Sequence, residues 1–139
     1  QMLLKRLIII LTRLAKERYT DNSLNSAQLD IIRSYNMLVE MHYRNEHQVK
    51  FYADQLHKSP KTLAHLFALY NHKSPLAVIQ ERIMLEAKRL LMYTKKSAKE
   101  IAFHLGFEDA AYFSNSFKKH TGHTPQDFRR LAIPASSGQ

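Results

Sequence analysis

Cysteine is absent from this 139-residue chain, and glycine and proline occur only three and four times. Without cysteine there can be no disulfide scaffold, thiolate zinc site or cysteine nucleophile. A core without disulfides suits the cytoplasm, which is the localisation we expect. The scarcity of glycine and proline favours helices, and no long alternating run of valine, isoleucine and threonine predicts strands. We therefore expect an all-α fold.

Long hydrophobic runs are also missing. The one strongly apolar stretch, Leu7–Leu11, is too short to span a bilayer, and no small-residue cleavage site follows it, so we expect neither a membrane span nor a signal peptide. The net charge is +9. Seven basic and four acidic residues occur in each of the ranges 1–44, 45–93 and 94–139, so no tail holds the excess. This charge suggests a polyanionic partner without choosing between nucleic acid and membrane.

Apolar periodicity and capping signals predict helices along most of the chain. Met2–Arg18 carries leucines at 3-4-3 spacing, and a second helix is expected over Ser26–His42. The other expected helices are Val49–Leu56, Pro60–Tyr70, Pro75–Tyr93, Ala98–Leu105, Asp109–His120 and Pro125–Leu131. We expect residues 1–44 to form linker or dimerisation helices, residues 45–132 to form the main domain, and residues 133–139 to be a disordered tail.

The most informative feature is an internal repeat. Ala53 and Leu56 match Ala102 and Leu105 at an offset of 49, while Leu63, Phe67 and Ser74-Pro75 match Phe113, Phe117 and Thr124-Pro125 at an offset of 50. The added residue falls in a turn. Each copy therefore reads as a short helix, a tight turn, a second helix and a Ser/Thr-Pro restart, which predicts helix-turn-helix units at 49–70 and 98–120.

The turn of each unit requires a sharp change of chain direction, which favours a positive φ. Gly106 adopts that conformation freely. His57 occupies the matching place in the first copy, so we expect it to adopt a positive φ at some energetic cost. The small side chains of Ala53 and Ala102 suit the close crossing of the two helices.

The second helix of each unit has an outward face that mixes hydrogen-bonding, small and basic side chains. Opposite the buried stripe lie Lys61, His65 and Ala68 in the first unit, and Ala111, Asn115 and Lys118 in the second. Thr62, Ala64, Tyr112 and Ser114 lie on the flanks. Such a face suits a helix that enters the major groove of DNA and contacts base edges.

A long motif runs through the same region. It comprises Arg82-Ile83, Ala87-Lys88-Arg89-Leu90-Leu91, Lys99-Glu100-Ile101-Ala102, Leu105-Gly106-Phe107, Tyr112-Phe113-Ser114, Phe117-Lys118-Lys119, Gly122, Thr124-Pro125 and Phe128-Arg129. From Val49 to Arg130 the chain thus resembles the DNA-binding domain of AraC/XylS-family transcription regulators. The resemblance implies two units held by one linking helix, with both recognition helices in successive major grooves of double-stranded DNA. The upstream helices resemble the segment that joins this domain to the family's effector-sensing domain, and we expect that sensing domain to be absent from these 139 residues.

The resemblance also implies roles for individual residues. By position, base contacts fall at Lys61, Thr62, Ala64 and His65 and at Ala111, Tyr112, Ser114 and Asn115, and phosphate contacts fall at Arg82 and Lys118. Asn115 stands where the family often has arginine, and asparagine can pair with adenine. The linking helix Pro75–Tyr93 would span roughly 27 Å. With its flanking units it can therefore match the roughly 34 Å repeat of B-DNA.

Other classes of function have less support. The eight histidines include no i, i+4 pair, so we expect no metal site. No Ser/His/Asp set, Gly-rich phosphate loop or carboxylate pair indicates an enzyme or a cofactor. The alternative is a non-catalytic helical protein-interaction module, which would bind DNA weakly. RNA polymerase is a further partner that we consider. The expected helix Met2–Arg18 either mediates a homodimer with the same helix of a second chain or packs onto Ser26–His42.

Overall fold

The computed structural model describes residues 25–70 and 73–132, and these residues form seven α-helices and no strand. The first helix covers residues 25–42. The others are α2 (Val49–Gln55), α3 (Pro60–Tyr70), α4 (Pro75–Tyr93), α5 (Ala98–His104), α6 (Ala110–Thr121) and α7 (Pro125–Ala132). The all-α prediction is confirmed. The helix expected over Met2–Arg18 and the tail expected over 133–139 lie outside the described residues.

The helix starts follow from local capping chemistry. The Ser74 side chain accepts a hydrogen bond from the Ala77 amide, and Pro75 occupies the first turn of α4. Ser97 and Glu100 form a capping box at the start of α5. Asp109 caps α6 from outside the helix, where we expected it to be the first helical residue.

The repeat is built into the order of the helices. The starts of α2 and α5 differ by 49 residues (Val49 and Ala98), and those of α3 and α6 differ by 50 (Pro60 and Ala110). α4 and α7 both begin at a proline, again 50 residues apart. The added residue therefore lies in the turn of the second unit, as predicted.

The two turns share one hydrogen-bonding scheme. In the first, the amide of Lys58 donates to the Ala53 carbonyl at 2.9 Å, and His57 has a φ of 55°. In the second, the amide of Phe107 donates to the Ala102 carbonyl at 2.9 Å, and Gly106 has a φ of 83°. This is the Schellman arrangement, which needs a left-handed residue after the helix. The positive φ expected for His57 is confirmed.

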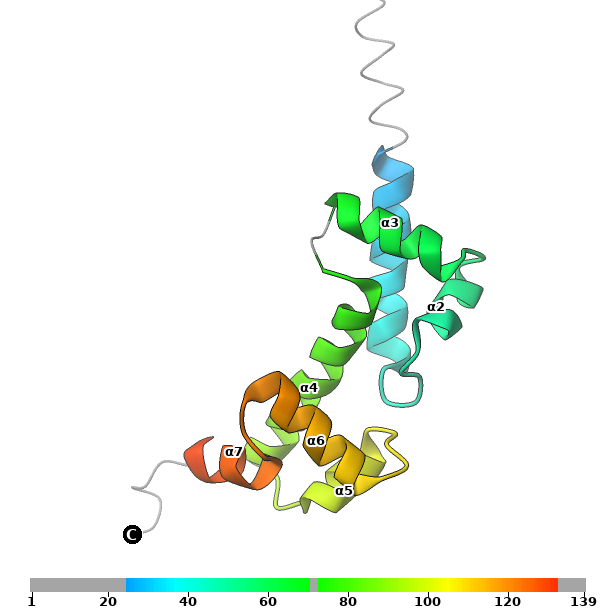
Figure 1. Cartoon of the computed structure of the whole chain (residues 1–139). Helices are drawn as coiled ribbons and strands as arrows, with labels where there is room; N and C mark the ends of the chain where they lie inside the picture. Colours follow the sequence, from blue (N-terminus) through cyan, green and yellow to red (C-terminus); the bar gives the residue numbers. More distant parts are fainter. Residues whose placement is uncertain (1–24, 71–72, 133–139) are drawn as a thin grey trace, which may run out of the picture.

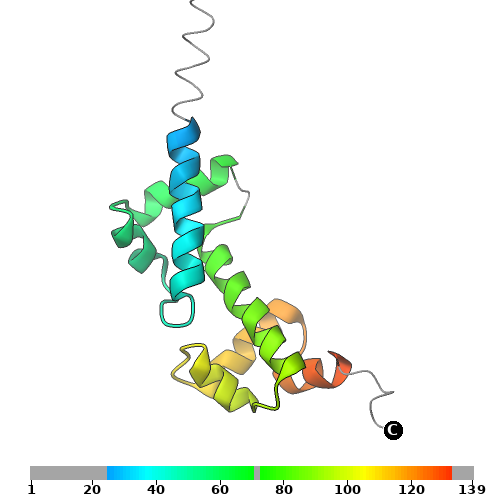
Figure 2. The same ribbon diagram turned by 180° about the vertical axis from the view of Figure 1, so that it is seen from behind.

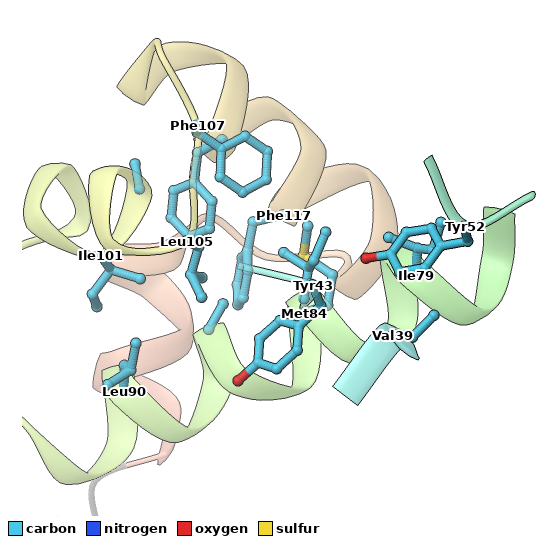
Figure 3. Packing of buried hydrophobic residues seen from close by; sticks show 14 of the residues in the cluster. Val39, Tyr43, Tyr52, Ile79, Met84, Leu90, Ile101, Leu105, Phe107 and Phe117 are labelled. Atoms are coloured by element: carbon cyan, nitrogen blue, oxygen red, sulfur yellow. The ribbon is translucent and has the colours of Figure 1, made fainter. Parts of the chain in front are cut away.

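One hydrophobic core joins the two units. Figure 3 shows Tyr43 and Met84 lying between Tyr52 of the first unit and Phe117 of the second. Tyr35, from the helix over residues 25–42, is fully buried in the same cluster, and its hydroxyl donates to the Pro75 carbonyl at 2.6 Å. The core therefore continues across residue 44, where we expected the boundary between the N-terminal linker or dimerisation helices and the main domain.

The helices form two layers. Figures 1 and 2 place α3 and α6 on one side of the molecule, and α4 and the helix over residues 25–42 on the other. Arg129 of α7 holds the far end of α4, because its guanidinium donates to the carbonyls of Leu91, Thr94 and Lys96. No helix in the described ranges is long and apolar enough to cross a membrane.

Candidate nucleic-acid interface

The outward face of α3 begins at the first turn of the helix. Leu63, Leu66 and Phe67 are buried and fix the helix against the core. The four residues expected to contact bases are all exposed, namely Lys61, Thr62, Ala64 and His65. Thr62 also forms hydrogen bonds at the start of α3. Its amide donates to the Ser59 hydroxyl oxygen at 3.1 Å, and its own hydroxyl lies 2.9 Å from the same atom.

The outward face of α6 is arranged in the same way. Phe113 and Phe117 are fully buried. Of the four residues expected to contact bases, Ala111, Tyr112 and Asn115 are exposed and Ser114 is half-buried. Tyr112 is 66% exposed and its ring centroid lies 6.0 Å from that of Phe107, so much of this residue remains accessible on this flank.

The charge of both recognition helices suits a polyanion. Neither α3 nor α6 contains an acidic residue, whereas the last turn of α6 carries Lys118, Lys119 and His120. The amides at the start of each helix add partial positive charge at the end that carries the outward side chains. Within the described ranges, no group of three His, Asp or Glu residues could hold a metal ion.

A scan against protein-family models adds a direct finding to this geometry. Residues 52–131 match the family described as "Helix-turn-helix domain", an AraC-type model, and this range covers most of the first unit, the linking helix and the second unit. The chain belongs to the AraC/XylS-type helix-turn-helix family. The family resemblance inferred from the motif over Val49–Arg130 is therefore confirmed.

Relatives and solved structures agree with this assignment. The chain is 25% identical over 130 residues to the HTH-type transcriptional activator RhaS of Escherichia coli O157:H7, covering 94% of this chain and 45% of that protein. The C-terminal domain of AraT from Geobacillus stearothermophilus matches with a TM-score of 0.70 and 26% identity, covering 76% of this chain and 88% of that one. The DNA-binding domain of AdpA, solved in complex with a target DNA, has the same fold, with a TM-score of 0.62 and 22% identity over 75% of this chain and 90% of that one. The chain spans less than half of the length of RhaS.

Arg82, implied by the family to contact phosphate, lies in an ion-pair cluster. Its Nε is 2.6 Å from the Glu40 carboxylate, and its guanidinium carbon lies 4.2 Å from the centroid of the Tyr43 ring. Its side chain is only 23% exposed. Gln80 precedes it by two residues on α4 and so points to nearly the opposite side. Gln80 lines the hollow beside Tyr112, so Arg82 faces away from that hollow.

Glu86 is the buried charge at the centre of this cluster. Hydrogen bonds from Arg89 lower the pKa of the Glu86 carboxyl, and the charges of Arg89, Arg82 and Arg44 act in the same direction against the effect of burial. Glu86 is only 4% exposed. Sequence reasoning did not single out this residue. Arg82 and Arg89 lie near Glu86 on α4 itself, but its burial and its third partner, Arg44, depend on how the segment before α2 packs beside α4.

Proposed function

We propose that this chain is the DNA-binding part of a transcription regulator and that it inserts α3 and α6 into successive major grooves of one duplex. The observation that carries the proposal is the pair of acid-free recognition helices on one side of the molecule. α4, with 19 residues, is about 27 Å long. That length is comparable with the roughly 34 Å repeat of the groove.

In this proposal the exposed side chains of each recognition helix read the bases. Lys61, His65 and Asn115 carry most of the preference, because they can form directed hydrogen bonds to base edges. Ala64 and Ala111 offer close apolar contact, such as that with a thymine methyl. Thr62, Tyr112 and Ser114 complete the set proposed from the family resemblance.

Phosphate contacts are proposed for Lys118 and Arg82. Lys118 is exposed on α6 and can turn toward a backbone phosphate. Arg82 can reach a phosphate only by leaving Glu40, so binding there has to replace one ion pair with another. The proposed contact at Lys118 therefore has the smaller local cost. RNA polymerase and a second copy of the chain are two further partners that we propose.

Selection of bound duplexes from a random library tests the proposal. The expected product is a bipartite motif whose halves lie about one helical turn apart. On that duplex, Asn115→Ala should relax preference at one base pair and cost roughly 1–3 kcal/mol of affinity. Lys118→Ala is the matched control from the same helix. It should weaken binding to all sequences alike and reduce the salt slope by about 1.

The same experiments can refute the proposal. A helical protein-interaction module would bind duplex DNA weakly and with little dependence on salt, whereas neutralised phosphates make affinity fall steeply as salt rises. Titration of the selected duplex at two salt concentrations separates these cases. The base-contact assignment is wrong if Asn115→Ala keeps the wild-type ratio of affinities for selected and scrambled duplexes.

A further inference from the structure

The loop over residues 43–48, here called the bridging loop, touches both helix-turn-helix units. On the first unit, the Tyr52 hydroxyl of α2 donates to the Glu46 carbonyl at 2.7 Å. On the second, Nε2 of His47 lies 2.7 Å from the Leu105 carbonyl oxygen, which is part of the turn between α5 and α6. Since a carbonyl only accepts, this nitrogen must carry the proton and donate.

The contact with the second unit is close-packed as well as hydrogen-bonded. The ring of His47 lies 4.9 Å from that of Phe107, measured between centroids. The carbonyl of Arg44 approaches Gly106 so closely that a Cβ at that position would lie 2.0 Å from its oxygen. Three successive residues of the second turn, 105–107, are thus covered by the bridging loop.

The helices of the two units make few direct contacts with each other. Within the described residues, α2 and α3 pack on each other and on α4. α5 and α7 pack on α4, and α6 packs on α5 and α7, without substantial packing of α2 or α3 against α5 or α6. A single helix fixes the separation of two units better than their rotation about its axis. The bridging loop supplies a second attachment away from that axis.

We propose that His47 is a positioning residue for DNA recognition: by tying the bridging loop to the turn at 105–107, it fixes the orientation of α6 relative to α3. This inference rests on the proposed DNA-binding function. When two recognition helices are rigidly placed, the second contact forms with a high effective concentration, and avidity exceeds either affinity by about 10²–10⁴-fold. Loosening the tie lowers this gain while leaving each unit able to read its own half-site.

The test uses the full chain and the duplex selected from a random library. Versions with one half scrambled report half-site binding, and versions with one or two base pairs inserted between the halves report the tolerance to spacing. His47→Ala should lower full-site affinity by about tenfold, leave the half-site affinities unchanged and flatten the dependence on spacing. His47→Gln, whose amide can donate to the Leu105 carbonyl, should restore part of the loss.

His42→Ala is the matched control. The His42 ring lies 5.1 Å from that of Phe51 on α2, so it packs within the first unit and does not bridge. This variant should keep the wild-type spacing profile. Circular dichroism must show that each variant is folded. If His47→Ala is not, His47→Gln should show a smaller loss of the same kind on the duplexes with no, one or two inserted base pairs.

The outcomes are distinguishable. Equal losses on full and half sites for His47→Ala would overturn the positioning role, because they would indicate direct DNA contact or damage to the second unit. An unchanged spacing profile would overturn it too. Failure of the wild-type chain to prefer the selected duplex over a scrambled one would instead refute the proposed function itself.

Discussion

Three residues with positive φ allow the energetic cost of a left-handed backbone to be measured separately from that of a steric overlap. Gly122, with a φ of 84°, has nothing within 4 Å of the place where a Cβ would stand, whereas at Gly106 that atom would lie 2.0 Å from the Arg44 carbonyl oxygen. His57 already has a side chain at a φ of 55°. Glycine-to-alanine changes at the first two positions and His57→Gly therefore probe backbone strain with and without a steric overlap.

The expected magnitudes follow from two opposing effects. A left-handed conformation costs a non-glycine residue about 1–2 kcal/mol, and the smaller backbone entropy of alanine in the unfolded chain returns about 0.4–1 kcal/mol. Gly122→Ala should therefore lower the free energy of unfolding by about 1 kcal/mol. His57→Gly reverses both effects and should be neutral or stabilising by up to about 1 kcal/mol.

Gly106→Ala adds the overlap with the backbone of the bridging loop. Forcing extra atoms into a packed site costs about 1–3 kcal/mol, so the total loss should be about 2–4 kcal/mol. Urea unfolding followed by circular dichroism measures all three variants, and an unchanged slope shows that the denatured state is unaltered. Equal losses for Gly106→Ala and Gly122→Ala would refute the reasoning, because they would mean that the Arg44 carbonyl moves aside freely.

Three further predictions concern the core and its charges, and a fourth concerns the oligomeric state. Glu86→Gln should lower the free energy of unfolding by about 1.5–3 kcal/mol, the usual loss of charged hydrogen bonds. Because the pKa of Glu86 is lowered in the folded state, the stability that this carboxylate contributes is lost as pH falls through its folded-state pKa. The free energy of unfolding of the variant should therefore depend less on pH in acid than that of the wild type. Burial raises the pKa of Tyr52 to about 12, so stability should fall between about pH 10 and 12 and fall less in Tyr52→Phe; equal alkaline slopes would contradict this. Arg129→Lys should lower the melting temperature, because one ammonium cannot replace a planar guanidinium on three carbonyls, and an unchanged melting temperature would count against that clamp. Light scattering on the chain with and without residues 1–18 tests the proposed homodimer, which fails if both forms are monomeric at high concentration.

The features that could be predicted from the sequence are those set by local chemistry. Ser74-Pro75 and Ser97 with Glu100 mark helix starts wherever they occur, because the caps lie within a few residues of the amides they serve. Because His57 matches Gly106 in the repeat, its positive φ could be predicted, although a histidine alone does not predict that conformation. Periodicity around Leu63 was enough to predict which side of α3 is exposed.

The features that could not be predicted depend on contacts between distant segments. Arg82 lies on a flank of α4, and the pattern there is equally compatible with solvent, phosphate or an acidic neighbour; its pairing with Glu40 joins residues 42 apart in the sequence. The apolar spacing that includes Tyr35 likewise predicts a buried side of its helix, but it does not indicate which segment covers that side. For that reason the sequence suggested linker or dimerisation helices over residues 1–44, and it did not indicate that Tyr35 belongs to the common core.

The bridging loop has a practical consequence for protein engineering. The family match begins at residue 52, which invites transplanting residues from there onward as a portable cassette in chimeric regulators. Such a cassette would leave behind His47, which ties down the second turn, and Tyr35, whose ring closes over Tyr52 and Phe67. It would also uncover apolar surface on α2 and α3. A chimera that retains residues 25–48 keeps both the aromatic ring of Tyr35 over the first unit and the His47 contact with the second, so the useful cut site lies before residue 25.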